Sequence, residues 1–188
     1  MAPVRSQYWL TAADPIFPRN QPAVILPDAR AYTRPELGAL LFGLREHASV
    51  SLDARELPPE MSGYAFADDP DGWRSLEDGA PALRMFLPAL DRLRIRSYVV
   101  GCSTYTPDGL FLLGEAPGIT GLLMASGCCG AGIAVSGGLG DAVASLALGE
   151  EPTCDITPFR LDRFGAVDPF APAFRARCGD ARARKTAG

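Results

Sequence analysis

The sequence predicts an α+β fold in which an antiparallel β-sheet carries packed helices. Residues 3–50 contain short extended segments separated by turns, with no room between them for the helices that a parallel sheet needs. Between residues 72 and 92, apolar side chains recur at intervals of three and four, which is the spacing of a helix face. A glycine-rich turn then joins a short strand to a long helix over residues 121–149.

The predicted sheet contains five extended segments: VRSQYWLT, AVIL (23–26), ARAYTRPE (29–36), ALLFGL (39–44) and IRSYVVGCSTYT (95–106). Only Leu37 and Gly38 separate the third from the fourth, which predicts a β-hairpin. We expect Pro35 near the turn of this hairpin or on a sheet edge, because proline has no N–H to donate.

Helices are expected in two regions. Pro81 and Pro88 interrupt the apolar pattern between 72 and 92, which predicts two short helices there. The apolar face from Ile133 to Ala147 predicts one longer helix, and Gly149 is a typical residue just beyond a helix end.

Composition and charge exclude several functional classes. The net charge is −4 and no basic run is large enough for a nucleic-acid face. No apolar run approaches the roughly 20 residues of a membrane span. The segment MAPVRSQYWL has no secretion-signal pattern, so we expect a cytoplasmic protein.

The five cysteines do not form a recognisable metal or redox motif. Cys128 and Cys129 are adjacent, which is not the C-x-x-C spacing, and His47 is the only histidine. We therefore expect reduced thiols and no metal site.

The most informative pattern is the G-x-x-G-x-G turn formed by Gly127, Gly130 and Gly132. Backbone amides at the start of a helix can approach an anion closely, and the helix dipole favours negative charge there. A tight turn with close packing is the alternative interpretation. The spacing is neither the G-x-G-x-x-G of an ADP-binding turn nor a phosphate loop, so any cofactor contact involves another part of the cofactor.

Two runs resemble FAD-dependent oxidoreductases of the D-amino-acid oxidase, sarcosine oxidase and glycine oxidase type. TYTPDGLFLLGEAPGITGLLMASGCCGAGIAVSGGLGDAVASLALGEEP is similar to the closing segment of those enzymes, with its T-x-D-G turn, its G-x-x-G-x-G loop and its final helix. ARAYTRPELGALLFGLREH is similar to a strand–turn–strand of their substrate domain.

The resemblance implies that residues 1–105 are a substrate-domain portion and residues 106–150 a C-terminal FAD-binding portion. Residues 151–165 are then expected as an extended strap, and residues 166–188 as a disordered tail. The family's dinucleotide-binding N-terminal half (a Rossmann fold) has no counterpart in these residues. A partner polypeptide carrying that half, or self-association, is therefore expected.

The resemblance also implies where the flavin lies. The predicted FAD-binding residues are those of the glycine-rich loop and the helix start: Gly127, Gly130, Ala131, Gly132 and Ile133. Their amides would stabilise the negative charge that hydride transfer leaves on the N1–C2=O edge of the ring. Asp108 and Gly109 are expected to shape the preceding turn.

Other site predictions rest on single positions. Tyr32 and Tyr105 are candidate substrate contacts, and no catalytic residue is assigned. Arg34 either faces the substrate or pairs with Glu36 or Glu46. Glycine-oxidase-like members hold the substrate carboxylate with an arginine where this chain has Ser103, which disfavours a simple amino acid held in that way.

Cys102 is a candidate for covalent flavin attachment, because sarcosine oxidases use a cysteine on this strand. The aligned position is however Gly101, and a slip of one residue reverses the face of a strand. A buried or inert thiol is the alternative.

The sequence thus predicts an FAD-dependent oxidoreductase component that oxidises a C–N bond of a small amine or amino acid. A non-catalytic remnant or association module of the same fold, which binds no FAD alone, is the alternative. An independent nucleotide-phosphate binder is a third and weaker interpretation.

Overall fold

A computed structural model of the chain describes residues 1–185. Its seven strands are β1 (Ala2–Thr11), β2 (Val24–Leu26), β3 (Ala31–Glu36), β4 (Ala39–Leu44), β5 (Ile95–Tyr105), β6 (Leu112–Glu115) and β7 (Leu123–Ser126). Its helices are α1 (Trp73–Arg84), α2 (Gly132–Leu148) and α3 (Pro172–Ala183), with short 3-10 turns at Ala54–Glu56, Leu90–Arg92 and Thr157–Phe159. The predicted α+β class is confirmed.

The chain divides into two compact units. We call the first the sheet unit: Arg5–Ser49, Pro58–Cys102 and the end of the chain from Ala183. The second, the loop unit, contains Met1–Val4, Val50–Leu57 and Ser103–Arg182. The assignment of substrate-domain and FAD-binding roles to portions of the chain stays a prediction.

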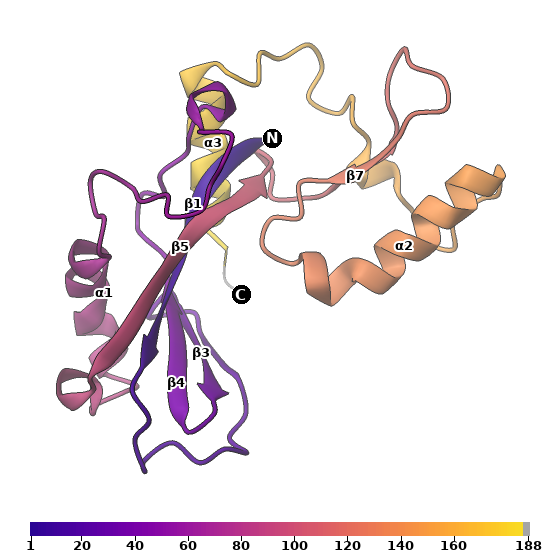
Figure 1. Cartoon of the computed structure of the whole chain (residues 1–188). Coiled ribbons are helices and arrows are strands. Elements are labelled where there is room, and N and C mark those ends of the chain that lie inside the picture. The colour runs from indigo at the N-terminus through magenta and orange to yellow at the C-terminus, as the bar shows by residue number, and fades with distance from the viewer. Residues whose placement is uncertain (186–188) are drawn as a thin grey trace. The chain divides into compact units, whose positions relative to one another are not determined.

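The sheet has five strands in the order β2-β3-β4-β1-β5 (Figure 1). The pairs β2–β3, β3–β4 and β4–β1 are antiparallel. The predicted hairpin is confirmed: Glu36 lies opposite Ala39, and both Leu37 and Gly38 have the left-handed backbone that a two-residue turn requires. Pro35 lies beyond the three residues of β3 that pair with β2, so its missing N–H disrupts no ladder.

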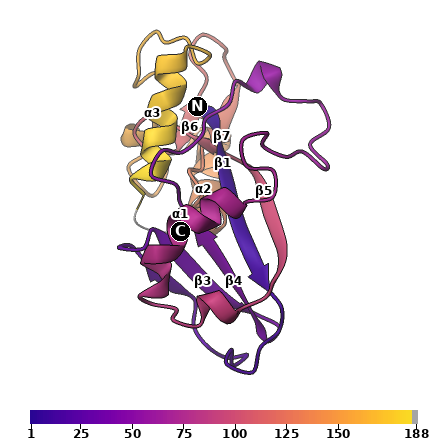
Figure 2. The same ribbon diagram turned by 90° about the vertical axis from the view of Figure 1, so that its left-hand side faces the viewer.

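Helix α1 covers one face of this sheet, as Figure 2 shows from the side. Its residues Leu76, Ala80 and Leu83 are buried, and they belong to one core cluster with Trp9 and Phe42 from the sheet. The rings of Trp9 and Phe42 are stacked, with centroids 5.6 Å apart.

The expected break at Pro81 is wrong, because α1 runs through this residue to Arg84. Pro81 is exposed, so its ring points away from the core. The buried face of the helix outweighs the one hydrogen bond that proline removes. Only the second expected helix is shortened, to a 3-10 turn at Leu90–Arg92.

The loop unit contains the β6–β7 hairpin, helix α2 and helix α3. Gly149 follows α2 with φ of 73° and donates its N–H to Leu146 O, which is the predicted helix end. The expected disorder of residues 166–188 is wrong for Pro172–Ala183, which forms α3, and the last three positions, 186–188, lie outside the described residues. Phe174, Cys178 and Ala181 recur at helical spacing and bury one face of α3 against Ala2 and Val4. Figures 1 and 2 both show α3 beside the N-terminus.

Candidate functional site

The T-x-D-G turn is closed by the side chain of Asp108. Its Oδ1 accepts hydrogen bonds from Thr106 Oγ1 and from Leu110 N, each at 3.0 Å. Gly109 N donates to Thr106 O at 3.2 Å. Burial opposes ionisation of Asp108, but hydrogen bonds from Arg163, Leu110 and Thr106 outweigh it and lower the pKa of this carboxyl. These contacts agree with a turn-shaping role for Asp108 and Gly109.

The glycine-rich loop is fastened to the end of β5 through Cys129. Cys129 N donates to Thr104 O at 3.0 Å, and its buried thiol donates to Gly127 O at 3.0 Å. Cys129 has a positive φ of 49°, which a residue with a Cβ adopts only when its surroundings hold it there. These two hydrogen bonds of Cys129 therefore fix the conformation of the loop.

Two glycines of this loop are close to side chains. A Cβ at Gly127 would lie 3.1 Å from Thr106 Cγ2, and the positive φ of 64° disfavours other residues as well. A Cβ at Gly132 would lie 3.2 Å from Cys128 Cβ and 3.3 Å from its sulfur. Glycine at 132 therefore lets the Cys128 side chain lie against the start of α2.

The first turn of α2 presents unpaired backbone amides. Ala131 stands at the N-cap and provides no side-chain cap. Within the described part of the chain, Val135 N is the first helical amide with a backbone acceptor, Ala131 O at 3.2 Å. The amides of Gly132, Ile133 and Ala134 remain open, as at any uncapped helix start. The side chain of Ile133 is 96% exposed at this helix start.

The five predicted FAD-binding residues thus lie together at one helix start. The Ala131 N–H already donates to Cys128 O at 2.8 Å, whereas the N–H groups of Gly132 and Ile133 are open at the positive end of the helix dipole. Open donors there suit a polarised carbonyl or an anionic edge. This arrangement fits the pyrimidine edge of a flavin ring. It offers nothing for the ADP part, whose G-x-G-x-x-G turn does not occur in the sequence.

Tyr105 packs in the same buried cluster as Cys129 of the loop. It is 4% exposed and belongs to the cluster that joins Val4 and Cys129 to Phe174 of α3. The structure thus gives Tyr105 packing contacts, and its role toward a substrate stays a prediction.

Tyr32 and Arg34 lie in the sheet unit on β3. The ring of Tyr32 lies across Gly43, its partner on β4. Arg34 forms an ion pair with Glu36, which was one of the two predicted alternatives. A substrate contact by Tyr32 stays a prediction.

Cys102 is partly buried near the end of β5, and burial raises the pKa of its thiol. Side chains alternate along a strand, so Cys102 shares a face with Tyr98. The Tyr98 ring lies against Gly72 at the start of α1. This position favours a buried thiol. Covalent attachment of flavin at Cys102 stays a prediction.

Sequence reasoning missed Arg163, which lies in the strap after α2 and binds Asp108 with two hydrogen bonds. The two residues are distant in the sequence, and an arginine in a polar segment carries no signal for its partner. A cavity of about 530 Å³ also lies in the loop unit, between the turn after β6 and the strap. None of the predicted site residues lines it.

Comparisons with known proteins show the family to which the chain belongs. The model of the family described as "FAD dependent oxidoreductase" matches residues 1–146. The chain is 30% identical over 173 residues to the mitochondrial dimethylglycine dehydrogenase of Mus musculus, covering 88% of the chain and 19% of that protein. It is 28% identical over 158 residues to the mitochondrial pyruvate dehydrogenase phosphatase regulatory subunit of the same species, covering 84% and 18%.

Among solved structures, glycine oxidase from Geobacillus kaustophilus is similar to this chain with a TM-score of 0.59 and 26% identity. The match covers 88% of this chain and 40% of that one. The strand, glycine loop and helix therefore belong to a flavoprotein class. The chain is a member of the FAD-dependent oxidoreductase family. It spans only about a fifth of the length of the two mitochondrial relatives given above. No helix within residues 1–185 is long and apolar enough to cross a membrane.

Proposed function

We propose that the chain supplies the substrate-domain sheet and the flavin-facing loop of an oxidoreductase that oxidises a C–N bond of an amine or amino acid. The observation that carries this proposal is the open helix start at Gly132 and Ile133, within the region that the family model matches. When bound, FAD supplies the acceptor for a hydride from the carbon next to the amine nitrogen.

Three residues have distinct parts in this proposal. The N–H groups of Gly132 and Ile133 would hold the acceptor edge of the ring by donating hydrogen bonds, and the helix dipole would add to their effect. Cys129 fixes the loop to β5, so these donors are aligned before the cofactor arrives. A preorganised donor stabilises developing charge without having to reorient during the reaction.

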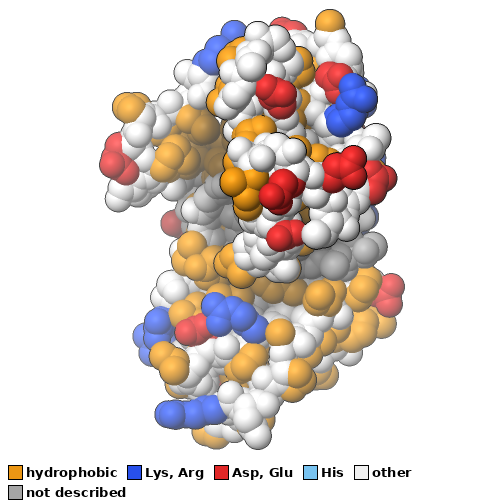
Figure 3. Space-filling view, turned by 90° about the vertical axis from the view of Figure 1, so that its right-hand side faces the viewer, with side chains coloured by type: hydrophobic (Ala, Val, Ile, Leu, Met, Phe, Trp, Pro, Cys, Tyr) orange, Lys and Arg blue, Asp and Glu red, His pale blue; other side chains and the backbone are white. Residues whose placement is uncertain are grey.

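The outer face of α2 supports docking of a further part of the flavoprotein. This face carries four exposed residues without polar side chains: Ile133, Gly137, Ala144 and Leu148. The exposed fraction is 96% for Ile133 and 73% for Leu148. Figure 3, turned to the side that carries α2 in Figure 1, shows hydrophobic side chains at the surface. An apolar helix face of this kind is normally covered. We infer that a dinucleotide-binding portion from outside these 188 residues covers it and holds the ADP part of FAD.

The experiment is reconstitution. The chain is co-expressed with a polypeptide from the same organism that carries a G-x-G-x-x-G turn after its first strand, and the purified complex is examined for flavin absorption. Sarcosine, dimethylglycine and glycine are then added without oxygen. Bleaching of the flavin by one of these amines supports the proposal. A complex that contains flavin but is reduced by no amine would contradict the proposed reaction.

A second candidate is a non-catalytic association module. One relative, at 28% identity, is named as a regulatory subunit, so this family region also occurs in a protein named for regulation. This candidate predicts a stable complex without flavin in the same reconstitution. Flavin content therefore separates the two functions.

A further inference from the structure

Arg163 holds the T-x-D-G turn with a forked set of hydrogen bonds. Its Nε donates to Asp108 Oδ2 at 2.8 Å, and its Nη2 donates to Asp108 Oδ1 at 3.0 Å. The same Nη2 also donates to Leu110 O at 3.0 Å. Arg163 therefore contacts both the carboxylate that closes the turn and the backbone just after it.

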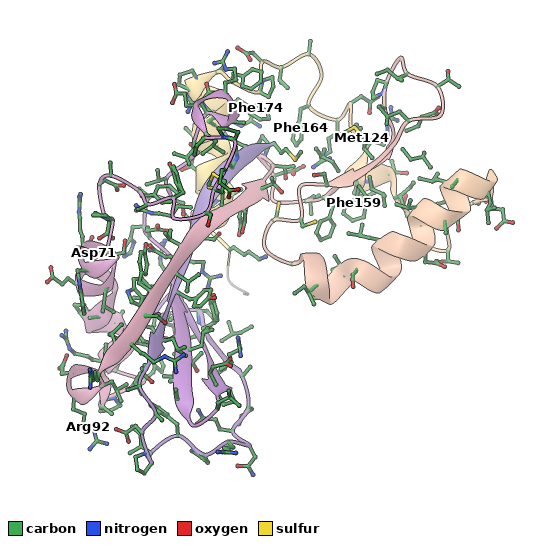
Figure 4. The ribbon with its side chains drawn as sticks, in the orientation of Figure 1. Asp71, Arg92, Met124, Phe159, Phe164 and Phe174 are labelled. Carbon is green, nitrogen blue, oxygen red and sulfur yellow. The ribbon has the colours of Figure 1, made fainter. Side chains whose placement is uncertain are left out.

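The remaining donors of Arg163 fasten the strap. Its Nη1 donates to Phe159 O at 3.2 Å and to Arg160 O at 2.9 Å. The guanidinium also lies 4.4 Å from the centroid of the Phe164 ring. Figure 4 labels Phe159 and Phe164, which lie on either side of Arg163 in the sequence. All five N–H groups are used, and the side chain is only 14% exposed, as expected of a built contact and not of a solvated surface arginine.

The turn that Arg163 holds is in contact with the glycine loop. Thr106, which is fully buried, donates to Leu110 O at 2.6 Å or to Asp108 Oδ1 at 3.0 Å. Its Oγ1 lies 3.6 Å from Cys129 Sγ, and its methyl group packs beneath Gly127. Thr106 is thus shared by the turn and the loop, so a shift of the turn is transmitted to the loop.

We propose that Arg163 is a positioning residue for the loop Gly127–Gly132. The chain leaves the loop through α2 and returns in the strap, where Arg163 locks the turn that precedes the loop. We call the hydrogen bonds of Arg163 to the turn and the strap the lock, and the contacts given above establish it. Its effect on a bound flavin rests on the proposed function.

The test uses the 188-residue chain and compares amide hydrogen exchange in three variants. Arg163→Met removes the guanidinium and all its hydrogen bonds. Arg163→Lys keeps the positive charge but cannot form the paired hydrogen bonds to Asp108. Arg160→Met is the matched control: Arg160 lies in the same strap, its side chain is 62% exposed, and its guanidinium forms an ion pair with nearby Asp162. Loss of charge-assisted hydrogen bonds predicts exchange about tenfold faster or more at the hydrogen-bonded amides of Cys129, Ala131 and Val135 in both Arg163 variants.

The β3–β4 hairpin provides the reference for this measurement. Its amides are expected to keep their exchange rates in the Arg163 variants, because the lock is local. Unchanged exchange in the loop, or equal acceleration in the hairpin, would overturn the proposal, since the second pattern indicates only a lower global stability. If Arg163→Met does not fold, Asp108→Asn removes the carboxylate charge while keeping the turn acceptor, and the same local pattern is expected.

A second readout concerns the reconstituted flavoprotein. Arg163→Lys is expected to shift the visible spectrum and the reduction potential of the bound flavin, whereas Arg160→Met leaves both unchanged. Faster exchange in the loop with an unaltered flavin spectrum would retain the lock and contradict the placement of this loop at the flavin. The two proposals therefore fail separately.

Discussion

The ring of Tyr32 lies so close to Gly43 that a Cβ added at Gly43 would fall 2.2 Å from Tyr32 Cε1 and 2.6 Å from its hydroxyl oxygen. The two residues are directly paired across β3 and β4. An aromatic ring that covers a cross-strand glycine compensates for the packing that glycine cannot provide.

The Tyr32–Gly43 pair predicts a destabilising effect of Gly43→Ala. The new methyl group would displace the ring, and overpacking of this kind costs about 1–3 kcal/mol of unfolding free energy. Gly101→Ala is the control, because nothing lies within 4 Å of its added Cβ. Urea denaturation measures both. Equal stability of the two variants would show that the Tyr32 ring moves aside freely.

Asp69 predicts a pH effect on the stability of α1. Gly72 at the N-cap has no side chain, and Asp69 instead accepts from Arg74 N at 3.1 Å and Ser75 N at 2.9 Å. Burial opposes ionisation of Asp69, but hydrogen bonds from Ser75 and Arg74 outweigh it and lower its pKa. Asp69→Ala is expected to lower the unfolding free energy by about 1–2 kcal/mol at neutral pH.

The sign of the pH dependence follows from that lowered pKa. Asp69 contributes its full stabilisation above the unfolded pKa of about 3.9, and loses it as the pH falls through the lower folded value. The deficit of Asp69→Ala is therefore expected to shrink below about pH 4, as measured by denaturation at several pH values. Asp71→Ala, at the exposed neighbour labelled in Figure 4, is the control. A deficit that stays constant down to low pH would argue against the carboxylate as the cap.

Local patterns explain why most elements could be predicted from the sequence. The hairpin at Leu37 and Gly38 and the end of α2 at Gly149 depend on neighbouring residues alone. The glycine loop was recognisable because its spacing and order match a family pattern. Its detailed support by Cys129 was not, because the left-handed conformation of a cysteine depends on its surroundings.

The remaining features depend on long-range contacts. Helix α3 has many Ala and Arg residues, and only the spacing of Phe174, Cys178 and Ala181 indicated a buried face. The rings of Phe164 and Phe174, both labelled in Figure 4, meet edge to face with centroids 6.4 Å apart. Such a contact becomes visible only once the strap and α3 are placed in space.

The isolated 188-residue chain is expected to bind FAD weakly or not at all. In the proposed function the amides of Gly132 and Ile133 contact the ring alone, whereas the pyrophosphate needs a G-x-G-x-x-G turn that this sequence lacks. Titration of the purified chain with FAD, followed by flavin fluorescence, measures the affinity. Co-purification of stoichiometric flavin with the chain alone would contradict this expectation.

Gly132→Val tests the loop in the reconstituted flavoprotein. The new side chain would meet Cys128, because even a Cβ at this position lies 3.2 Å from Cys128 Cβ. If the proposed function holds, this displaces the helix-start amides from the flavin edge. Loss of one such donor predicts reduction of the flavin by substrate that is about a hundredfold slower. Stopped-flow measurement of anaerobic flavin reduction, on protein shown by circular dichroism to be folded, gives the rate.

A compensating variant makes this prediction specific to the loop. Cys128→Gly removes both the Cβ and the sulfur that lie 3.2 and 3.3 Å from the added Cβ, so the flavin of the double variant Gly132→Ala with Cys128→Gly is expected to be reduced faster than that of Gly132→Ala alone. If the glycine served only to allow a tight turn, the substitutions would lower the unfolding free energy and leave the reduction rate of the folded protein unchanged. An unchanged rate together with unchanged flavin affinity would remove Gly132 from the site. We expect the rate to fall in Gly132→Val and to recover in part when Cys128 is shortened, because the clash and the donor belong to the same turn of α2.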